Sequence, residues 1–197
     1  IHLQPFIPHY REEFFDLLGK RLKQGAVNDI SLDQEIYTYE KTKDVKSASF
    51  QMSHIVCKHI PSKLIKGKLL FYNPFSLLGK ENKVLVLMLH FAHFGTWILL
   101  LTKWLHHKKI ILWGQGISVR RYLKEKKKPY WKLKWMIALA DGIWFYMDKE
   151  KDQWQKYFPD KPMVALCNTL SGVDEMTKYQ PDLTKDELKA KYGVKQD

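Results

Sequence analysis

Cysteine is scarce in this sequence of 197 residues: only Cys57 and Cys167 occur, and neither belongs to a CxxC pair. Two thiols cannot build the framework of several disulfides that small secreted domains use, and they do not form a cysteine-rich metal site. Because both lie in apolar or strand-like stretches, we expect buried, free thiols in a reducing compartment. The chain opens without methionine and without the pattern of a secretory signal, so we expect a cytoplasmic protein.

Acidic residues are also few. Lys and Arg number 33 against 21 Asp and Glu, which gives a formal net charge of +12 and a pI near 9.5. No acidic residue occurs between Lys83 and Lys124. A basic balance of this size favours anionic partners and does not choose among nucleic acid, acidic lipid surfaces and phosphorylated substrates. The seven tryptophans and a hydrophobic content of 45% indicate a folded globular protein.

Several catalytic signatures are absent. The sequence contains no Gly-x-Ser-x-Gly nucleophile motif, no Walker motif and no zinc-finger spacing. His90 and His93 have the spacing of a metal-binding pair, but no acidic residue near them could complete such a site. We therefore expect no metal ion and no cofactor.

One apolar run, residues 84–101, has about the length that crosses a bilayer. Two histidines and a glycine interrupt it, and a lysine lies close to each end. We interpret it as a buried strand (84–89) and a buried helix start (96–101) joined by a short loop, rather than as a membrane span.

Strands and helices alternate regularly in the second half of the chain. Strands separated by helices of about ten to fifteen residues favour a parallel sheet. Continuous apolar runs such as KKIILW and GIWFYM are typical of strands covered on both faces. We therefore predict an α/β fold with a Rossmann-like, doubly wound, mostly parallel sheet. The predicted strands are 84–89, 109–113, 142–146 and 163–167, and the predicted helices are 96–106, 129–140 and 148–158.

The first part of the chain predicts a strand over residues 1–3 and a helix over 11–24. The apolar face of this helix is expected to consist of Phe14, Leu17, Leu18 and Leu22. Further strands are expected within EIYTYE, SFQMSHIVCKHI and KLLFYNP, with turns at Pro61 and Gly67 between the last two.

The periodic pattern fades after residue 167. We expect residues 1–167 to form one Rossmann-like domain and residues 168–197 to be a linker and a lead-in helix to a further domain. That short helix is predicted from Thr184 as N-cap, Glu187 completing a capping box, and Gly193 as the stop.

Ligands bind outside the carboxyl ends of the strands in open parallel sheets. One loop at such an end is Gly114-Gln115-Gly116, where the glycines would allow close backbone approach and Gln115 can donate and accept hydrogen bonds. The pattern also suits an ordinary turn. His93, in the preceding strand's loop, is either a substrate-bonding side chain or a packed loop histidine.

The first strand leads into His9, Tyr10 and Arg11 at the start of a helix. A helix N-terminus beside an arginine can receive an anion, although a capping loop with an exposed arginine fits equally well.

Residues 120–135 carry eight basic residues against one acid, with aromatic residues between them. Such a segment could lie on an anionic bilayer, follow a nucleic acid backbone, or be a solvated basic face whose tryptophans pack inward. Its candidate members, with the two arginines assigned to the cleft, are Arg120, Arg121, Lys126, Lys127, Lys128, Trp131, Lys132, Lys134 and Trp135.

The sequence resembles the N-terminal, acceptor-binding domain of family 4 glycosyltransferases, which have the GT-B fold. The resemblance is carried by KKIILWGQG, the basic aromatic helix, ALADGIWFYMDKEKDQW and MVALCNTLSGVDEM in that order. LQPFIPHYREEFFDLL is similar to the first strand and helix of one subgroup, and LTKDELKAKYGV to the segment before the second domain. The similarity is best over 84–197, fair over 1–24 and poor over 27–80.

The resemblance implies one half of a GT-B fold and a retaining, metal-independent transferase. Such an enzyme moves a sugar from a nucleotide-sugar donor to a glycan or lipid-linked acceptor, here in bacterial surface polysaccharide biosynthesis. Most of the donor site would belong to a second domain, so this chain alone is expected to be inactive. An anionic membrane surface, on the inner face of the cell membrane, is a further expected partner.

Gln115 stands where many relatives carry a histidine that reaches the donor sugar. A glutamine can hydrogen-bond a sugar hydroxyl but cannot act as a base. The glycine pair of the relatives' first loop is replaced here by Pro8, His9 and Tyr10. Two alternatives remain open: a basic α/β module that binds nucleic acid, and a different α/β enzyme acting on phosphorylated small molecules.

Overall fold

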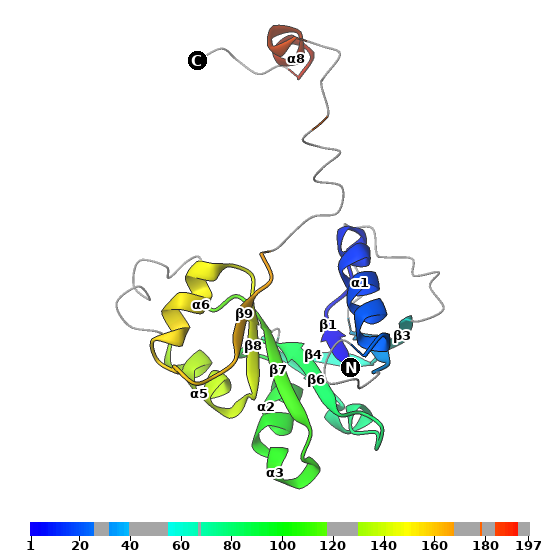
Figure 1. The fold of residues 1–197 in the computed structure, drawn as a ribbon, viewed down its shortest axis with the longest axis vertical. Coiled ribbons are helices and arrows are strands. Elements are labelled where there is room, and N and C mark those ends of the chain that lie inside the picture. The colour runs from blue at the N-terminus through cyan, green and yellow to red at the C-terminus, as the bar shows by residue number, and fades with distance from the viewer. Residues whose placement is uncertain are drawn as a thin grey trace.

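The computed structural model describes residues 1–25, 32–39, 55–66, 68–117, 130–167, 178 and 184–192. Its centre is a sheet of seven strands, shown in Figure 1. All strand pairs in this sheet are parallel. The strands are β1 (His2–Gln4), β2 (Gln34–Thr38), β3 (Ile55–His59), β6 (Val84–Met88), β7 (Lys109–Gly114), β8 (Gly142–Phe145) and β9 (Met163–Ala165).

The strand order is β3-β2-β1-β6-β7-β8-β9. The order therefore runs one way from β1 through β2 to β3 and the other way from β6 to β9. This reversal is the topological switch point of a doubly wound sheet, and it lies between β1 and β6. The predicted α/β, Rossmann-like fold is confirmed.

Helices cover the two faces of the sheet unequally. Side chains of α2 (Phe94–Leu101), α5 (Trp131–Leu139) and α6 (Asp148–Gln155) join one large apolar core with Leu85, Leu112 and other inward residues of the strands. A smaller core on the opposite face contains Phe15 of α1 (Glu12–Lys23), Val86 and Trp113. Strand residues alternate between these two cores, which is why the apolar runs of β7 and β8 are nearly continuous.

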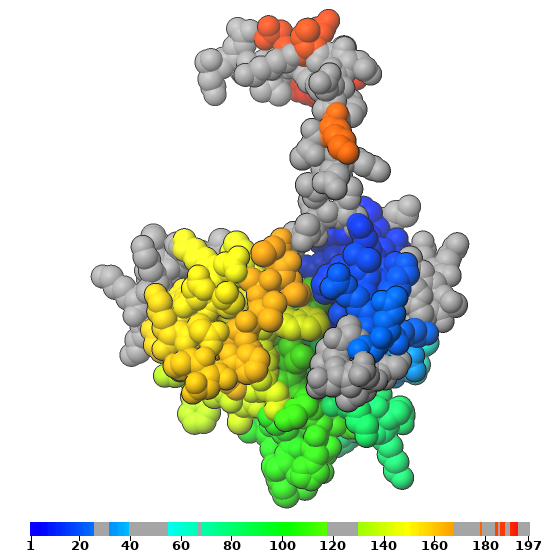
Figure 2. Space-filling view, viewed as in Figure 1, coloured from blue at the N-terminus to red at the C-terminus, as the bar shows by residue number. Residues whose placement is uncertain are grey.

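On the smaller core's face, α1 is the covering helix among the described residues. In the space-filling view, α1 (blue) and β9 (orange) both face the viewer, and green and yellow surface is visible between them (Figure 2). Trp144 and Tyr146 are accordingly only partly buried there.

The predicted helix over residues 96–106 is divided into α2 and α3 (Lys103–His106). The Thr102 hydroxyl donates a 2.7 Å hydrogen bond to the Ile98 carbonyl, and a threonine that bonds back in this way competes with the helical ladder. His107, with a left-handed φ of 55°, ends α3. The other predicted helices and strands of this half agree with the structure within a few residues.

The predicted apolar face of the first helix is right only in part: Phe14 packs against the smaller core, whereas Leu17 does not face it. Phe15 is 1% exposed and Leu17 is 51% exposed, and Asp16 and Gly19 are also buried. The ring of Phe15 packs at 5.5 Å from the His2 ring and 6.0 Å from Trp113. The buried face of α1 is therefore centred on Phe15.

Residues 62–72 form an antiparallel hairpin of β4 (Ser62–Ile65) and β5 (Leu69–Tyr72), beside the short helix η2 (Pro74–Leu77). The prediction of a single strand here missed β4. Near the C-terminus, α8 (Lys185–Tyr192) has the expected capping box: the Glu187 carboxylate accepts from the Thr184 backbone N–H at 2.7 Å. Gly193 lies outside the described residues.

The apolar run over 84–101 forms β6, a loop and α2, as expected. Among the described residues, none of the helices combines the length and the apolar character that crossing a bilayer requires.

The prediction of buried cysteines is wrong, since Cys57 and Cys167 are both exposed, unpaired thiols. Cys57 belongs to β3 and Cys167 follows β9, which are the two outermost strands of the sheet. An apolar sequence context therefore does not bury a side chain at the margin of the sheet.

Candidate functional site

A cavity of about 610 Å³ lies at the carboxyl ends of β6, β7 and β8. Its wall combines aromatic and aliphatic groups with a few polar groups, as small-molecule sites do. The lining residues are Met88, Leu89, His90, Phe91, Ala92, Gly114, Gln115, Ile117, Tyr130, Leu133 and Tyr146.

The predicted glycine loop supplies part of this wall, with Gly114 and Gln115 both lining the cavity. The exposed Gln115 side chain follows the buried end of β7, so its amide can donate to and accept from a bound molecule. The main sequence-predicted site residue therefore lines a hollow at the carboxyl ends of β6, β7 and β8.

Gly114 and Gly116 are glycines for a reason other than the predicted one, which was the close approach of a ligand to the backbone. A Cβ on Gly114 would lie 3.0 Å from the Leu89 Cβ, and a Cβ on Gly116 would lie 2.6 Å from both Phe145 Cε1 and Trp154 Nε1. The protein's own side chains therefore occupy the space that the glycines leave open. The glycines shape the loop that carries Gln115 rather than admitting a ligand at their own Cβ positions.

Arg11 approaches the cavity from β1's side of the sheet. Its guanidinium carbon lies 4.9 Å from the Trp113 ring centroid and 5.3 Å from the ring of Tyr146, which lines the cavity. Cation–π contacts of this kind hold a charge beside aromatic faces. Arg11 therefore contacts Tyr146, a residue that lines the cavity, without being among the lining residues itself.

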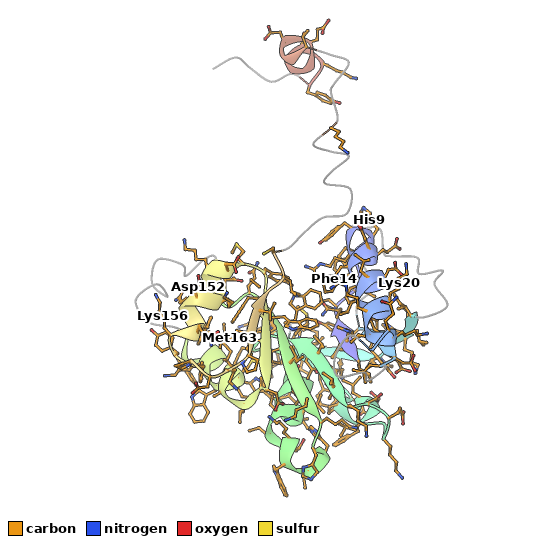
Figure 3. All side chains as sticks on the ribbon, viewed as in Figure 1. His9, Phe14, Lys20, Asp152, Lys156 and Met163 are labelled. Carbon is orange, nitrogen blue, oxygen red and sulfur yellow. The ribbon has the colours of Figure 1, made fainter. Side chains whose placement is uncertain are left out.

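His9 and Tyr10, with Arg11, form the short helix η1 (His9–Arg11) before α1. Figure 3 shows His9 at the outer end of α1, while Phe14 points toward the strands. The exposed His9 does not line the cavity; its ring contacts Tyr10 at 5.8 Å.

His93 lies behind the cavity wall. It is 7% exposed, its ring centroid is 4.7 Å from that of His90, and its Nε2 is 3.5 Å from the Tyr39 hydroxyl. Burial, with the nearby His90 as a smaller cause, lowers the pKa of His93 to about 3. Burial also lowers the pKa of His90. Both rings are therefore neutral at physiological pH, and His93 packs within the loop rather than facing the cavity.

Glu150 does not line the cavity but lies beneath two of its loops, and the sequence analysis did not single it out. It is only 2% exposed, and burial raises the pKa of its carboxyl. The Tyr146 N–H, after β8, donates to its Oε2 at 3.3 Å, and the backbones of Met147, Gly116 and Ile117 also favour its charged form and so oppose this rise. Glu150 thus ties together the two loops that carry Tyr146 and Gln115. Its position three residues into α6 was the available signal, because acids favour a helix's first turn.

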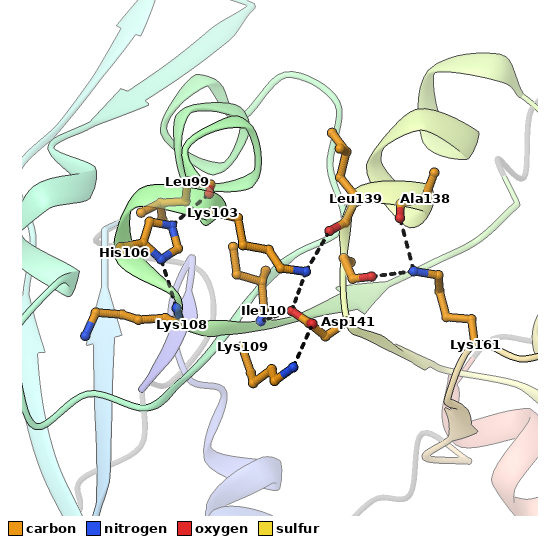
Figure 4. A network of polar contacts seen from close by, with 11 residues as sticks. Leu99, Lys103, His106, Lys108, Lys109, Ile110, Ala138, Leu139, Asp141 and Lys161 are labelled. Atoms are coloured by element: carbon orange, nitrogen blue, oxygen red, sulfur yellow. Dashed lines mark hydrogen bonds and ion pairs between the residues drawn. The ribbon is translucent and has the colours of Figure 1, made fainter.

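Asp141 belongs to the ALADGIWFYMDKEKDQW stretch that carries the resemblance. It lies at the amino end of β8, opposite the end at which the cavity lies. Its carboxylate accepts from the Ile110 N–H at 2.8 Å and pairs with Lys103 at 2.8 Å and Lys109 at 3.4 Å (Figure 4). Partial burial opposes ionisation, but the Lys103 and Ile110 hydrogen bonds outweigh it and hold the pKa of Asp141 below its usual range. This network joins the starts of β7 and β8 and has no part in the cavity.

The tryptophans of the basic helix do not pack inward as one interpretation held. Trp131 is 60% exposed and Trp135 is 62% exposed, on α5 with Lys132 and Lys134. Several other predicted site and signature residues lie outside the described residues. They are Arg120, Arg121, Lys126, Lys127, Lys128, Asn168 and Thr169.

Within the part of the chain that the structure describes, no three His, Cys, Asp or Glu side chains converge as they would to hold a metal ion. No protein-family model matches the chain. No curated protein matches it in sequence either.

Proposed function

We propose that this chain is the acceptor-binding half of a glycosyltransferase with a GT-B fold. It would receive a sugar from a nucleotide-sugar donor held mainly by a second domain. The acceptor would be a glycan or a lipid-linked glycan of a bacterial surface polysaccharide. By the resemblance, transfer retains the anomeric configuration and needs no metal.

The observation that carries the proposal is the cavity at the carboxyl ends of β6, β7 and β8. Its aromatic wall, formed by Phe91, Tyr130 and Tyr146, offers flat apolar surfaces, and Gln115 offers an amide. A sugar ring presents both apolar C–H faces and hydroxyl groups, which such a wall matches. Arg11 lies behind Tyr146 and adds positive charge near the cavity, which favours an acceptor that carries phosphate.

In this proposal the residues of the chain bind and orient the acceptor. Gln115 holds a sugar hydroxyl, and Glu150, whose carboxylate is occupied by backbone N–H groups, fixes the loop that carries Gln115. Proton transfer during the reaction is not assigned to Gln115, because an amide is not a base.

Calorimetry with this chain tests the proposal. The probes are a short-chain prenyl pyrophosphate disaccharide, the same disaccharide without the lipid, a panel of nucleotide sugars and a single-stranded oligonucleotide. We expect saturable binding of the glycan probes, weakened about fivefold by Gln115→Ala, since one lost hydrogen bond is worth roughly 1 kcal/mol.

Gln24→Ala is the matched control, because Gln24 is exposed at the end of α1 and does not line the cavity. Glycan binding that Gln115→Ala and Gln24→Ala leave equally strong would contradict the assigned site. Tight, salt-sensitive binding of the oligonucleotide alone would instead favour the nucleic-acid module.

A further inference from the structure

Large apolar side chains are exposed over the outer surface of the layer formed by the β4–β5 hairpin, α2, α3 and α5. We call this surface the aromatic face and define it by Phe71, Phe94, Leu101, Trp104, Trp131 and Trp135. Trp104 is the most exposed of the three tryptophans, at 71%. Apolar patches of this extent mark interaction sites rather than ordinary solvated surface.

Side-chain contacts join the hairpin to α2, and the loop before α2 to α5. The rings of Phe71 on β5 and Phe94 on α2 lie 6.0 Å apart. The Lys132 ammonium on α5 lies 4.0 Å from the ring of Phe91, in the loop before α2, and 5.5 Å from the ring of Trp131. Elements far apart in the sequence therefore present one surface.

Charge on the five elements of this layer has a single sign. The segments β4, β5, α2, α3 and α5 contain no aspartate or glutamate, whereas they contain Lys63, Lys103, Lys132 and Lys134. The acids of the chain are found elsewhere, for example in α1 and α6, whose sequences are EEFFDLLGKRLK and DKEKDQWQ. Among Asp, Glu, Lys and Arg, these five segments therefore carry only lysines, and Asp141, which follows α5, pairs with Lys103.

We propose that the aromatic face docks on a lipid bilayer whose surface carries anionic lipids. Tryptophan is the side chain that prefers the boundary between headgroups and acyl chains, and lysine adds attraction to anionic lipids. Exposed tryptophans interspersed with lysines, with no acid among them, match such a surface in both respects.

The docking is to the surface charge of the bilayer rather than to one headgroup. A hollow of about 510 Å³ beside Trp104 is lined by Lys103, Lys108 and Lys109. These lysines already have partners: Lys108 donates to the Gly79 and Asn82 carbonyls, each at 2.6 Å, and the other two pair with Asp141. The hollow therefore has no uncommitted cluster of cations for a single phosphate.

The aromatic face adjoins the cavity. Phe91 lines the cavity and also contacts Lys132, and Tyr130, which precedes Trp131, lines it as well. Docking would bring the cavity wall to the bilayer, so its substrate would be a lipid-linked acceptor presented by the membrane. This last step rests on the proposed function, whereas docking itself does not.

Vesicle flotation with the chain tests docking without any acceptor present. Vesicles of phosphatidylcholine alone are compared with vesicles that also contain about one third phosphatidylglycerol. We expect binding to the anionic vesicles, reduced by salt, and about tenfold weaker binding for the double variant Trp104→Glu/Trp135→Glu.

Leu17→Glu on α1 and Tyr192→Glu on α8 are the matched controls, because both replace exposed apolar side chains on elements that do not form the aromatic face. Equal loss of binding in these controls, or no binding to anionic vesicles, would overturn the proposal. Concentration-dependent dimerisation that Trp104→Glu abolishes, without vesicle binding, would assign the face to a second copy instead.

Fluorescence quenching by brominated acyl chains gives a second readout with variants that keep the aromatic character. Trp104→Phe/Trp135→Phe should reduce the quenching, and Trp144→Phe, on the opposite face of the sheet, should not; the reverse result would overturn the assigned orientation. Gln115→Ala should keep vesicle binding. Loss of glycan binding in every assay while vesicle binding persists would contradict the proposed function and leave docking intact.

Discussion

The indole Nε1 of Trp154, on α6, donates a 2.8 Å hydrogen bond to the backbone carbonyl of Gly116. The same ring lies against the position where a Cβ of Gly116 would stand. A buried tryptophan thus fixes both the path of the loop after β7 and the requirement for glycine in it. The position of Gln115 depends on this contact, because Gln115 is the preceding residue.

Gly116→Ala should destabilise the fold by about 1–3 kcal/mol, because the added methyl would overlap Trp154 and Phe145 in a packed core. Urea unfolding checks the free energy of unfolding. Gly142→Ala is the control, since its nearest contact would be 3.4 Å from the new Cβ. Equal losses in the two variants would show that the loop repacks around the methyl group.

Glu150→Ala should leave the Tyr146 N–H without its acceptor, at a cost of about 1–3 kcal/mol in stability. It should also weaken glycan binding, because the loops carrying Gln115 and Tyr146 lose their common anchor. Thermal melts and the calorimetric assay measure the two effects. Asp152→Ala, an exposed acid on the same helix, should change neither; a matching effect there would implicate helix charge instead.

Acid should destabilise the protein because two histidines are buried in neutral form. Burial lowers the pKa of both His2 and His93 to about 3, from 6.5. Between those values the unfolded chain binds protons that the folded chain does not, so the free energy of unfolding falls as pH drops below about 6.5. Each histidine contributes roughly 1.4 kcal/mol per pH unit.

Unfolding by urea at pH 7 and pH 5 measures this dependence. His93→Gln, which stays neutral, should remove part of the pH slope. An unchanged slope in His93→Gln would mean that His93 becomes accessible to water in the folded protein.

Both thiols should react in the folded protein. Cys57 is expected to react more slowly than a free thiol in water, because partial burial of its sulfur raises the pKa of the Cys57 thiol and reduces its thiolate fraction. Alkylation followed by mass spectrometry of Cys57→Ser and Cys167→Ser measures each rate separately. Reaction only after unfolding would contradict the exposed positions.

The sequence predicted the fold well where local patterns decide it. The apolar runs of β7 and β8 and the capping box at Thr184 each predict the bounds of their element within a few residues. The face of α1 was less predictable, because the choice between Phe15 and Leu17 depends on packing against His2 and Trp113, which are distant in sequence. The exposure of Cys57 depends on β3 being an outer strand, which no local pattern records.

The candidate site was also predictable in part, because its place follows from the predicted parallel sheet. The rule that ligands bind at the carboxyl ends of parallel strands selected the loop containing Gln115. It could not show that His93 turns behind the wall, or that Glu150 joins two loops, since both depend on how separate loops meet. The exposure of Trp131 and Trp135 likewise follows from the orientation of α5 on the sheet.

The absence of aspartate and glutamate from β4, β5, α2, α3 and α5 leaves lysines as the charged residues of this layer. A positively charged layer near a negatively charged surface orients the molecule before contact, so that the encounter occurs mostly with this layer foremost. The rate of arrival, more than the lifetime of the bound state, would then respond to ionic strength, because the long-range field is screened within about 8 Å at physiological salt.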